Sequence, residues 1–407
     1  MSASRFSKAS VRDAPVEGKR VLVRVDFNVP LGSTDPPTRV ADDTRIRAAL
    51  PTIELLRDRG AAVVLASHLG RPSDREPELS LRPVAEWLGE LIGTEVTLAM
   101  GVVGEEVERL AGALDPGELL LLENTRYEPG ETENDPELAR GMAALADLYV
   151  NDAFGAAHRA HASTEAIAHL LPAYAGLLLE REVAELTAVR DDPERPLVVV
   201  VGGAKISDKV GLIERYLDVA DRILVGGAMC FVFFRAQGIQ TGDSLVEDAG
   251  VVMAVRILAK AEESDCALLL PTDLVIGNSF DAHAKVREIE GVEVPEGWMG
   301  LDIGAGTADI YVEEVARAAT VLWNGPMGAF ELEPFAAGTV SIAEAVAAAE
   351  GRTVVGGGDS VAALERYGLT DRIDWVSTGG GASLELLEGK ELPGVEALLD
   401  AAEVPTS

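Results

Sequence analysis

The chain has 407 residues, of which 47% are hydrophobic and 25% are charged. Its 68 acidic and 35 basic residues give a net charge of −33, which excludes nucleic-acid binding through a general basic surface. This length and composition predict a globular chain of two or three domains, with no apolar run long enough to span a membrane.

The N-terminus lacks the apolar core of a signal peptide, and Cys230 and Cys266 lie in apolar segments without a disulfide framework. We therefore expect a cytoplasmic protein, and a monomer. The acids are dispersed, and 28 arginines outnumber 7 lysines. We also expect a salt-adapted, halophilic source, because molar salt shortens the Debye length to about 3 Å and makes such self-repulsion tolerable.

Short apolar runs in the first half of the chain are each followed at once by polar or basic residues. The runs cover residues 21–26, 61–67, 118–123 and 147–151, and helix-like segments such as 44–59 and 81–92 lie between them. Strands that alternate with helices predict a parallel, doubly wound α/β sheet, in which the residues after the strands gather at one edge.

Basic residues recur just past these predicted strands. They are Arg24, Arg45, His68, Arg71, Arg126, His158, Arg159 and His161. Scattered singly they would indicate solvated surface. In so acidic a chain, their repeated placement favours a pocket for a small polyanion, because the planar guanidinium group suits phosphate and carboxylate. Asp26 and Asn28 can accept hydrogen bonds from hydroxyl groups of the same ligand.

A helix is predicted over residues 177–190, between the two halves of the chain. Leu179, Val183 and Leu186 form one stripe with acids opposite, and the helix should stop before Pro193. We interpret it as a helix that connects two domains. An ordinary surface helix inside one domain is the alternative.

The segment from Leu197 to Lys209 reads LVVVVGGAKISDK, an unbroken apolar run followed by two glycines and two lysines. The run predicts a central strand buried on both faces, and Gly202 and Gly203 permit a tight turn at its carboxyl end. Lys205 and Lys209 would present positive charge to an anion there. An ordinary turn with two surface lysines is the alternative.

Further apolar runs in the second half end in glycine-rich stretches. They include Gly226-Gly227, WNGPMGAFE (323–331), VVGGGDS (354–360) and WVSTGGGAS (375–383). We expect Ser360 and Ser383 to open helices, so that glycines 356–358 and 379–381 present free N–H groups to phosphates. Asp359 can then hold Mg²⁺ together with phosphate oxygens. The chain has neither a P-loop nor a dinucleotide fingerprint, which argues against P-loop NTPases and Rossmann dehydrogenases.

An arginine-rich anion pocket and a set of glycine rims are the parts that an in-line phosphoryl transfer between two phosphorylated ligands requires. The sequence shows no Ser-His-Asp arrangement, no metal-ligand spacing of His or Cys, and no obvious buried base. A carboxylate or phosphate acceptor is already ionised, so transfer between an acyl phosphate and ADP needs no strong base.

Nine motifs occur in one order along the chain: RVDFNVP, SHLGRP, LENTRY, AHRAHAS, GGAKISDK, PEGWMGLDIG, WNGPMGAFE, GGGDS and STGGGASLE. In these motifs, and over nearly its whole length, the chain resembles the phosphoglycerate kinase family. The resemblance implies reversible phosphoryl transfer between 1,3-bisphosphoglycerate and ADP, giving 3-phosphoglycerate and ATP in glycolysis and gluconeogenesis, after hinge-bending closure.

The resemblance also implies a division of the chain into two doubly wound parallel-sheet domains joined by a helix and hinge. Residues 1–176 would bind phosphoglycerate, with the tail 392–407 packed back on them. Residues 177–190 would form the connecting helix, and residues 191–391 would bind the Mg²⁺ complex of ADP or ATP.

Roles for single residues follow from the same resemblance. The phosphoglycerate contacts would be Asp26, Phe27, Asn28, Arg45, His68, Leu69, Gly70, Arg71, Arg126, His158 and Arg159. The nucleotide contacts would be Gly203, Lys205, Lys209, Asn324, Glu331 at the ribose, Gly357, Gly358, Asp359 and Ser360, with Asp359 as the Mg²⁺ ligand. The catalytic groups that stabilise the transferred phosphoryl group would be Arg45, Lys205, Lys209 and the N–H groups of Gly379, Gly380 and Gly381.

Three features depart from the family pattern. Ser360 stands where threonine is usual, Ala305 replaces a usual proline, and residues 32–38 form an insertion-like loop that contains Pro36 and Pro37. Two alternatives stay open: another acyl-phosphate-forming kinase or ligase, and an inactive binding protein on the same fold.

Overall fold

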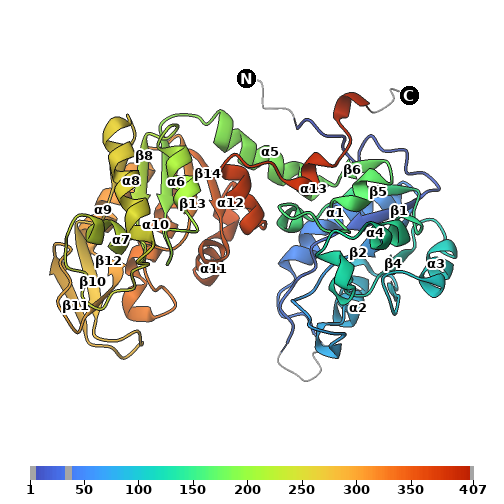
Figure 1. The fold of residues 1–407 in the computed structure, drawn as a ribbon, viewed down its shortest axis with the longest axis horizontal. Helices are drawn as coiled ribbons and strands as arrows, with labels where there is room; N and C mark the ends of the chain where they lie inside the picture. The colour runs from blue at the N-terminus through green and yellow to red at the C-terminus, as the bar shows by residue number, and fades with distance from the viewer. Residues whose placement is uncertain (1–5, 33–38, 404–407) are drawn as a thin grey trace. The chain divides into compact units, whose positions relative to one another are not determined.

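A computed structural model describes residues 6–32 and 39–403 of the chain, and Figure 1 shows its helices and strands. Contacts divide the chain into two units. Unit 1 holds the chain up to Ala184 together with the segment from Glu391 onward, and unit 2 runs from Glu185 to Lys390. The first boundary falls inside α5 (Leu177–Asp191), so a single helix continues from one unit into the other.

Unit 1 is built on a six-stranded sheet of order β3-β4-β2-β1-β5-β6, in which every pairing is parallel. Its strands are β1 (Arg20–Arg24), β2 (Ala62–Ala66), β3 (Thr97–Leu98), β4 (Leu119–Leu121), β5 (Leu148–Asn151) and β6 (Ala173–Ala175). Its helices are α1 (Thr44–Asp58), α2 (Arg82–Ile92), α3 (Glu105–Gly112), α4 (Pro136–Ala143) and α13 (Pro393–Glu396). The chain leaves β1 on the β2 side and returns on its other side at β5. The switch point between β1 and β5 is where such sheets bind ligands.

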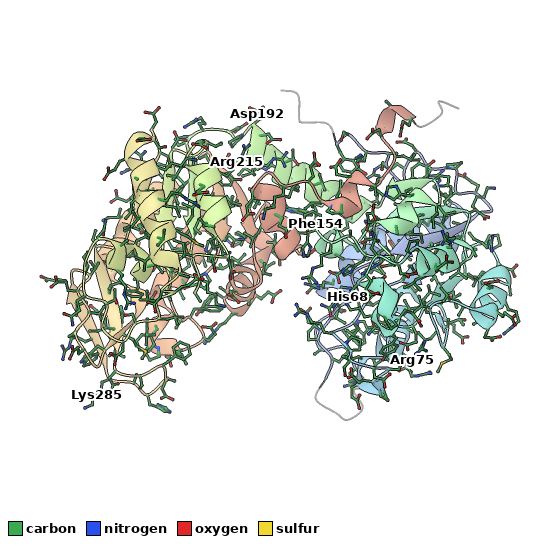
Figure 2. All side chains as sticks on the ribbon, in the orientation of Figure 1. His68, Arg75, Phe154, Asp192, Arg215 and Lys285 are labelled. Atoms are coloured by element: carbon green, nitrogen blue, oxygen red, sulfur yellow. The ribbon has the colours of Figure 1, made fainter. Side chains whose placement is uncertain are left out.

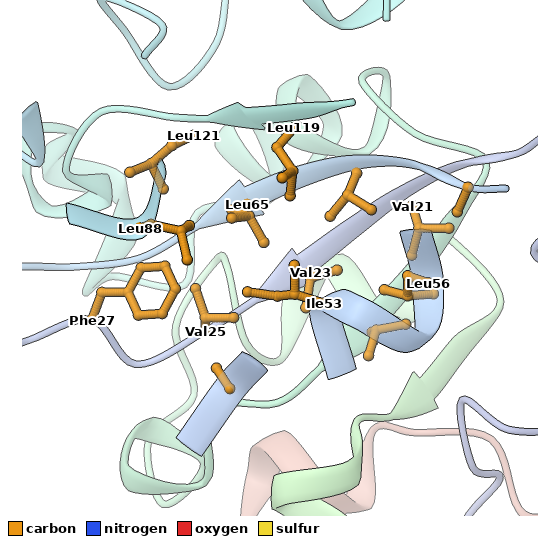
Figure 3. Close-up of a cluster of buried hydrophobic side chains, with 14 of the residues drawn as sticks. Val21, Val23, Val25, Phe27, Ile53, Leu56, Leu65, Leu88, Leu119 and Leu121 are labelled. Atoms are coloured by element: carbon orange, nitrogen blue, oxygen red, sulfur yellow. The ribbon is translucent and has the colours of Figure 1, made fainter. Parts of the chain in front are cut away.

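The core of unit 1 explains why β1 lies at the centre of the sheet. Val21 and Val23 of β1 belong to one buried cluster with Ile53 and Leu56 of α1 and Leu65 of β2 (Figure 3). Four of the five β1 residues are fully covered, as expected for a parallel strand that packs on both faces. This burial fixes the place where the residues after β1 emerge.

Unit 2 is built on a second six-stranded parallel sheet, of order β15-β14-β13-β7-β8-β9. Its strands are β7 (Leu197–Val201), β8 (Arg222–Val225), β9 (Ala267–Leu269), β13 (Thr320–Asn324), β14 (Arg352–Gly356) and β15 (Trp375–Val376). Its helices are α6 (Val210–Tyr216), α7 (Cys230–Ala236), α8 (Gly250–Glu263), α9 (Ala305–Ala316), α10 (Ala337–Ala348), α11 (Gly358–Arg366) and α12 (Gly381–Leu387). The prediction of parallel α/β sheets is therefore confirmed, and the switch point of this sheet lies between β7 and β13.

Unit 2 also contains a small antiparallel sheet that the sequence did not predict. It has the order β11-β10-β12 and consists of β10 (Asp273–Gly277), β11 (Val286–Glu290) and β12 (Met299–Ile303). Four of the five β11 residues are exposed. A strand of this kind has no apolar run, and the search for buried strands therefore missed it.

Helix α5 has the predicted bounds to within one residue, but its buried stripe is different. Leu179, Glu182, Leu186 and Val189 are buried, whereas Val183 is only partly covered. The expectation that all acids lie opposite the stripe is wrong for Glu182. The spacing of Leu179, Val183 and Leu186 correctly predicted a helix, but it did not show which face of that helix is buried.

The described part of the C-terminal tail pairs with unit 1. The Ala9 N–H donates to the carbonyl of Leu399 at 2.7 Å, and the Leu399 N–H donates to the carbonyl of Ala173 at 3.0 Å. Asn151 Nδ2 donates to the carbonyl of Gly394 at 2.9 Å. The tail therefore contacts the carboxyl end of β5, next to the switch point.

Among the described residues, no helix has both the length and the apolar character that a bilayer crossing requires. Cys230 and Cys266 are buried and free.

Candidate active site

The basic residues predicted for the anion pocket come from four neighbouring strands of unit 1 or from the segments after them. We call the following residues the basic cluster: Arg24, Arg45, His68, Arg71, Arg126, His158, Arg159 and His161. They come from the end of β1, the first turn of α1 and the segments after β2, β4 and β5. Because these strands run parallel and are adjacent, their following segments emerge at one edge, around the switch point.

Arg45 ties the segment after β1 to the start of α1. Its Nη1 lies 3.2 Å from Asp26 Oδ2 and 3.1 Å from the carbonyl oxygen of Asn28. Asn28 Oδ1 accepts the Gly70 N–H at 2.8 Å, which links this segment to the one after β2. The structure therefore brings these four predicted residues together.

Two residues predicted to contact phosphoglycerate have side chains that cannot do so. Phe27 is fully buried, Leu69 is 3% exposed, and both belong to the core of unit 1. The Phe27 N–H donates to Ser67 Oγ, and Asn124 Oδ1 accepts the Leu69 N–H. Their contribution is therefore to hold the backbone in place around the polar residues.

His68 is neutral and not one of the cations, although the sequence grouped it with them. It comes two residues after β2 in the chain and is 7% exposed, and its side chain is labelled in Figure 2. Burial, and then the charges of Arg24 and Arg126, hold the pKa of His68 well below its usual value. Arg24 Nη2 lies 3.1 Å from His68 Nδ1. Because arginine can only donate, Nδ1 is the acceptor and Nε2 carries the proton as a hydrogen-bond donor.

Arg126 is a partly buried cation with incomplete hydrogen bonding. Its Nη1 donates to the carbonyl of Gly70 at 2.5 Å, while its Nε is buried without a partner among the described residues. Burial, and then repulsion from Arg24 and Arg159, lower the pKa of Arg126. A buried donor among crowded cations favours an anionic ligand.

The outer part of the basic cluster is open to solvent. Arg71 and Arg159 are exposed, and Arg159 Nε lies 3.1 Å from His158 Nε2. Arginines with exposed guanidinium groups can adjust to a ligand, whereas the buried Arg24 cannot.

Unit 2 has a polar pocket of about 650 Å³ at the switch point between β7 and β13. We call it the glycine-rim pocket. Its lining comprises Gly202, Gly203, Ala204, Lys205, Ser207, Asp208, Lys209, Asn324, Gly325, Gly357, Gly358, Asp359, Gly380, Gly381, Leu384, Glu385, Glu388 and Lys390. The structure therefore gathers nearly all the predicted nucleotide-phosphate and catalytic residues of this half in one place.

Glycine is required at two points of this rim. A Cβ on Gly202 would lie 2.0 Å from the carbonyl oxygen of Pro326, so β7 and the segment after β13 could not approach each other. Gly357 has φ +94° and precedes the first turn of α11, a backbone conformation that side-chain residues rarely adopt. These glycines allow backbone N–H groups to line the pocket.

Lys209 differs sharply from Lys205. Lys209 is partly buried and donates to Asn324 Oδ1, and burial lowers its pKa from 10.5 to about 8, against the opposing charges of Asp208 and Asp359. Lys205 is exposed at the mouth of the pocket. One lysine is held in the wall, and the other is free to move.

The predicted roles of two serines as helix openers are wrong. Helices α11 and α12 begin at Gly358 and Gly381, with Gly357 and Gly380 as their N-caps. Ser360 is fully buried, and its Oγ accepts the Gly325 N–H at 2.6 Å. Ser383 Oγ lies 2.6 Å from Ser377 Oγ. The preference of serine for N-caps misplaced both starts, because the glycine rims supply the caps.

The two other departures from the family pattern are Ala305 in place of proline and the predicted loop over residues 32–38. Ala305 opens α9, whose Gly306 and Thr307 N–H groups donate to the carboxylate of Asp273 at 2.8 and 2.7 Å. The helix therefore begins there without proline. The predicted loop over 32–38 lies, from residue 33 on, outside the described residues.

A second pocket, of about 520 Å³, adjoins the first, because Gly203, Ala204 and Asp359 line both. We call it the apolar pocket. The rest of its lining comprises Gly227, Ala228, Asp243, Leu245, Phe280, Met299, Gly300, Leu301, Pro326, Gly328, Ala329 and Glu331. Glu331 therefore lies apart from the glycine-rim pocket, together with Gly227 and with residues of the WNGPMGAFE and PEGWMGLDIG motifs. Leu245 and Phe280 also line the apolar pocket, and the sequence did not single them out.

Asp359 is the described residue that best suits a Mg²⁺ ion carried by a nucleotide. It is exposed, it lies in the first turn of α11, and it lines both pockets. No group of three or more metal-ligating side chains occurs among the described residues. One carboxylate with ligand phosphate oxygens is a usual set for Mg²⁺, so the donor set fits an ion that arrives with its nucleotide.

Sequence reasoning also missed residues that support the basic cluster. Asn124 is fully buried and binds the backbone of Leu69 through both its Oδ1 and its Nδ2, at 3.1 and 2.7 Å. Glu131 is fully buried and accepts three hydrogen bonds from Ser163 and Thr125. Asn124 lies inside the LENTRY motif, whereas nothing in the sequence separates Glu131 from the many surface acids.

Comparison with known proteins supports a single family. A family model described as phosphoglycerate kinase matches residues 11–390. The chain is 54% identical over 402 residues to a phosphoglycerate kinase of Chloroflexus aggregans, covering 97% of this chain and 100% of that protein. It is 54% identical over 396 residues to one of Moorella thermoacetica, with the same coverage.

Solved structures agree with this match. The phosphoglycerate kinase of Coxiella burnetii has a TM-score of 0.86 at 40% identity, covering 96% of this chain and 98% of the other. That of Pyrococcus horikoshii has a TM-score of 0.82 at 31% identity, with the same coverage.

Proposed function

The chain belongs to the phosphoglycerate kinase family, and from this we propose how its two units share one reaction. It is a kinase of glycolysis, which transfers a phosphoryl group reversibly between 1,3-bisphosphoglycerate and ADP to give 3-phosphoglycerate and ATP. The 54% identity over nearly the whole chain carries this conclusion. It favours neither another acyl-phosphate kinase or ligase nor an inactive binding protein.

In our proposal, the basic cluster of unit 1 binds phosphoglycerate. Arg126 and the exposed Arg71 and Arg159 supply donors for its phosphate and carboxylate groups, because guanidinium groups bind such oxygens in pairs. Asp26 and Asn28 accept hydrogen bonds from its hydroxyl group. The buried, unpartnered Nε of Arg126 is the observation that most directly supports an anionic ligand here.

The two pockets of unit 2 are proposed to bind the nucleotide. The glycine-rim pocket would take the phosphates on its backbone N–H groups and on Lys209. The apolar pocket would take the base, with Glu331 at the ribose. Asp359 would hold Mg²⁺, which neutralises phosphate charge when it is bound.

Transfer itself needs no general base, because the attacking group of ADP or phosphoglycerate is already ionised. Arg45, Lys205, Lys209 and the N–H groups of Gly380 and Gly381 would stabilise the charge on the moving phosphoryl group. Since these groups belong to different units, the reaction requires a closed state in which both units reach one phosphoryl group, reached by bending at a hinge.

A coupled assay of ATP formation from 1,3-bisphosphoglycerate and ADP tests this division. Arg45→Ala should lower kcat by about 100-fold or more, as for loss of a transition-state donor, while the Kd for ADP stays nearly unchanged. Arg47→Ala is the matched control, because Arg47 is an exposed arginine of the same helix that pairs with Asp43 at 2.9 Å. Equal losses of kcat and ADP affinity in Arg45→Ala would contradict the assignment.

Cytoplasmic location, a monomeric state and a salt-adapted source complete the proposal. The source is supported by the charge of −33 and the preference for arginine, and the relatives reported above add no support for it.

A further inference from the structure

Glu131 is an acid buried beneath the basic cluster. Its side chain has no exposed surface. Its Oε1 accepts hydrogen bonds from the hydroxyl groups of Ser163 at 2.6 Å and Thr125 at 3.2 Å, and its Oε2 accepts the Ser163 N–H at 3.0 Å. A buried carboxylate is costly unless its surroundings compensate it, so its position here requires a physical reason.

Ser163 connects Glu131 to the arginines. The Ser163 Oγ that donates to Glu131 also accepts a hydrogen bond from Arg24 Nε at 2.8 Å, and Arg24 is fully buried. Arg24 Nη2 in turn lies 3.1 Å from His68 Nδ1. One chain of hydrogen bonds therefore runs from the acid to the imidazole ring of the basic cluster.

Glu131 also sets the net charge of the basic cluster. Burial lowers the pKa of His161 to about 4, against the opposing charge of Glu131, whose Oε1 lies 3.8 Å from His161 Nδ1. Burial, and then the charge of Arg24, hold the pKa of His68 well below its usual value, so both rings are neutral near pH 7. The charged groups are then Arg24, Arg45, Arg71, Arg126 and Arg159, with the carboxylates of Asp26 and Glu131. Five positive and two negative charges give the basic cluster, together with Asp26 and Glu131, a net charge of +3.

This charge matches the ligand. Phosphoglycerate carries about three negative charges at pH 7, one on its carboxylate and nearly two on its phosphate. Without Glu131, the five arginines and Asp26 would leave a net charge of +4 in the empty site. Burial, and then repulsion from Arg24 and Arg159, already lower the pKa of Arg126, and Glu131 opposes that shift.

We propose that Glu131 is a positioning residue for phosphoglycerate. It fixes Arg24 through Ser163, and its negative charge offsets one of the positive charges of the basic cluster, so that the arginines stay assembled before the ligand binds. The inference rests on the proposed substrate site. A purely structural Glu131, which only closes the turn after Arg126, would affect stability alone. The two roles differ in sign, because loss of a buried negative charge strengthens anion binding whereas loss of structure weakens it.

Glu131→Gln separates these roles. The amide keeps the contact with Ser163, whose hydroxyl can accept as well as donate, but the charge is lost. We expect the KM for 3-phosphoglycerate to be at least about three-fold lower, since the interaction of one nearby unit charge outweighs thermal energy at a protein's effective dielectric. The KM should also depend more steeply on salt, and the Tm without ligand should be lower. Ser163→Ala keeps the charge and frees Arg24, so its KM should rise.

Glu123→Gln is the matched control. Glu123 is 5% exposed, follows β4 and accepts hydrogen bonds from the Asn124 and Leu81 N–H groups, yet it is outside the basic cluster. This variant should lose stability with the KM and its salt dependence unchanged. A Glu131→Gln variant that behaves in the same way, or whose KM rises as in Ser163→Ala, would overturn the proposal.

Two further measurements keep the test decisive. If Glu131→Gln does not fold in chloride buffer, sodium sulfate should restore its native circular dichroism spectrum, because sulfate ions occupy the basic cluster. This effect should be stronger than the stabilisation of Glu123→Gln by the same salt. Failure of this rescue overturns the proposal. Arg71→Ala tests the substrate site itself and should raise the KM for 3-phosphoglycerate. If Arg71→Ala has no effect, the proposed site fails; if only the Glu131→Gln result is missing, the inference alone fails.

Discussion

Lys209→Met isolates the effect of burying a lysine in the glycine-rim pocket. The methionine side chain has a similar length and no charge. Burial lowers the pKa of Lys209 to about 8 in the native protein, whereas an exposed lysine of the unfolded chain has a pKa near 10.4. The native state therefore releases the proton at a lower pH than the unfolded state does.

The difference in pKa gives the size of the effect. Below pH 8 both states hold the proton, and the native state bears the whole cost of a charged, partly buried amine, about 3 kcal/mol. Between pH 8 and 10.4 only the unfolded state holds the proton, so the free energy of unfolding rises with pH. Above pH 10.4 the cost is gone. The free energy of unfolding of the wild type, relative to Lys209→Met, should therefore increase by about 3 kcal/mol from pH 7 to pH 10.5.

Urea unfolding of both proteins at several pH values measures this quantity. Loss of the donor to Asn324 Oδ1 adds a cost of about 1 to 3 kcal/mol to the variant, but this cost does not depend on pH and cancels in the comparison. Lys205→Met is the control, because Lys205 is exposed and its variant should show a flat difference. A flat difference for Lys209→Met as well would refute the reasoning.

Two other predictions concern the apolar pocket and the charge of the whole chain. Phe280→Ala should raise the KM for ADP several-fold and leave the KM for phosphoglycerate unchanged, because the Phe280 side chain is 64% exposed and lines the apolar pocket. The control is Val252→Ala on α8, where the native side chain is 77% exposed and lies outside that pocket. Equal effects of both variants on the KM for ADP would exclude a role for the pocket. Transfer from molar to about 10 mM salt lengthens the Debye length to roughly 30 Å, so the net charge of −33 should lower the Tm measured by circular dichroism. An unchanged Tm would exclude salt adaptation.

The sequence predicted the parts of the fold that depend on long buried patterns. The run from Leu197 to Val201 predicted a central strand, and β7 is indeed buried throughout and flanked on both sides. Helix α1 starts at Thr44 as expected. By contrast, β11 is mostly exposed, and its pairing depends on β10, which the sequence could not show.

The site was predicted best where residues follow strands, and less well where burial decides a residue's state. Strand topology brings Arg45 and Asn28 together, because parallel neighbours end at one edge. The neutral state of His68 depends on burial and on a particular arginine beside it. Glu131 was missed for the same reason, since only the folded chain distinguishes it from a surface acid.

The two proposed anion sites attract anions by different means, and this difference bears on the proposed function in high salt. In unit 1 the charge comes from arginines, of which Arg24 is fully buried and held by Ser163 and Glu131. In unit 2 the donors are mainly backbone N–H groups and Lys209, in a pocket that acidic side chains also line. Salt screens exposed charges strongly, but it screens buried charges and fixed dipoles far less. Under the proposed salt adaptation the chain would therefore still bind small anions, because at both sites part of the attraction comes from buried charges and fixed dipoles.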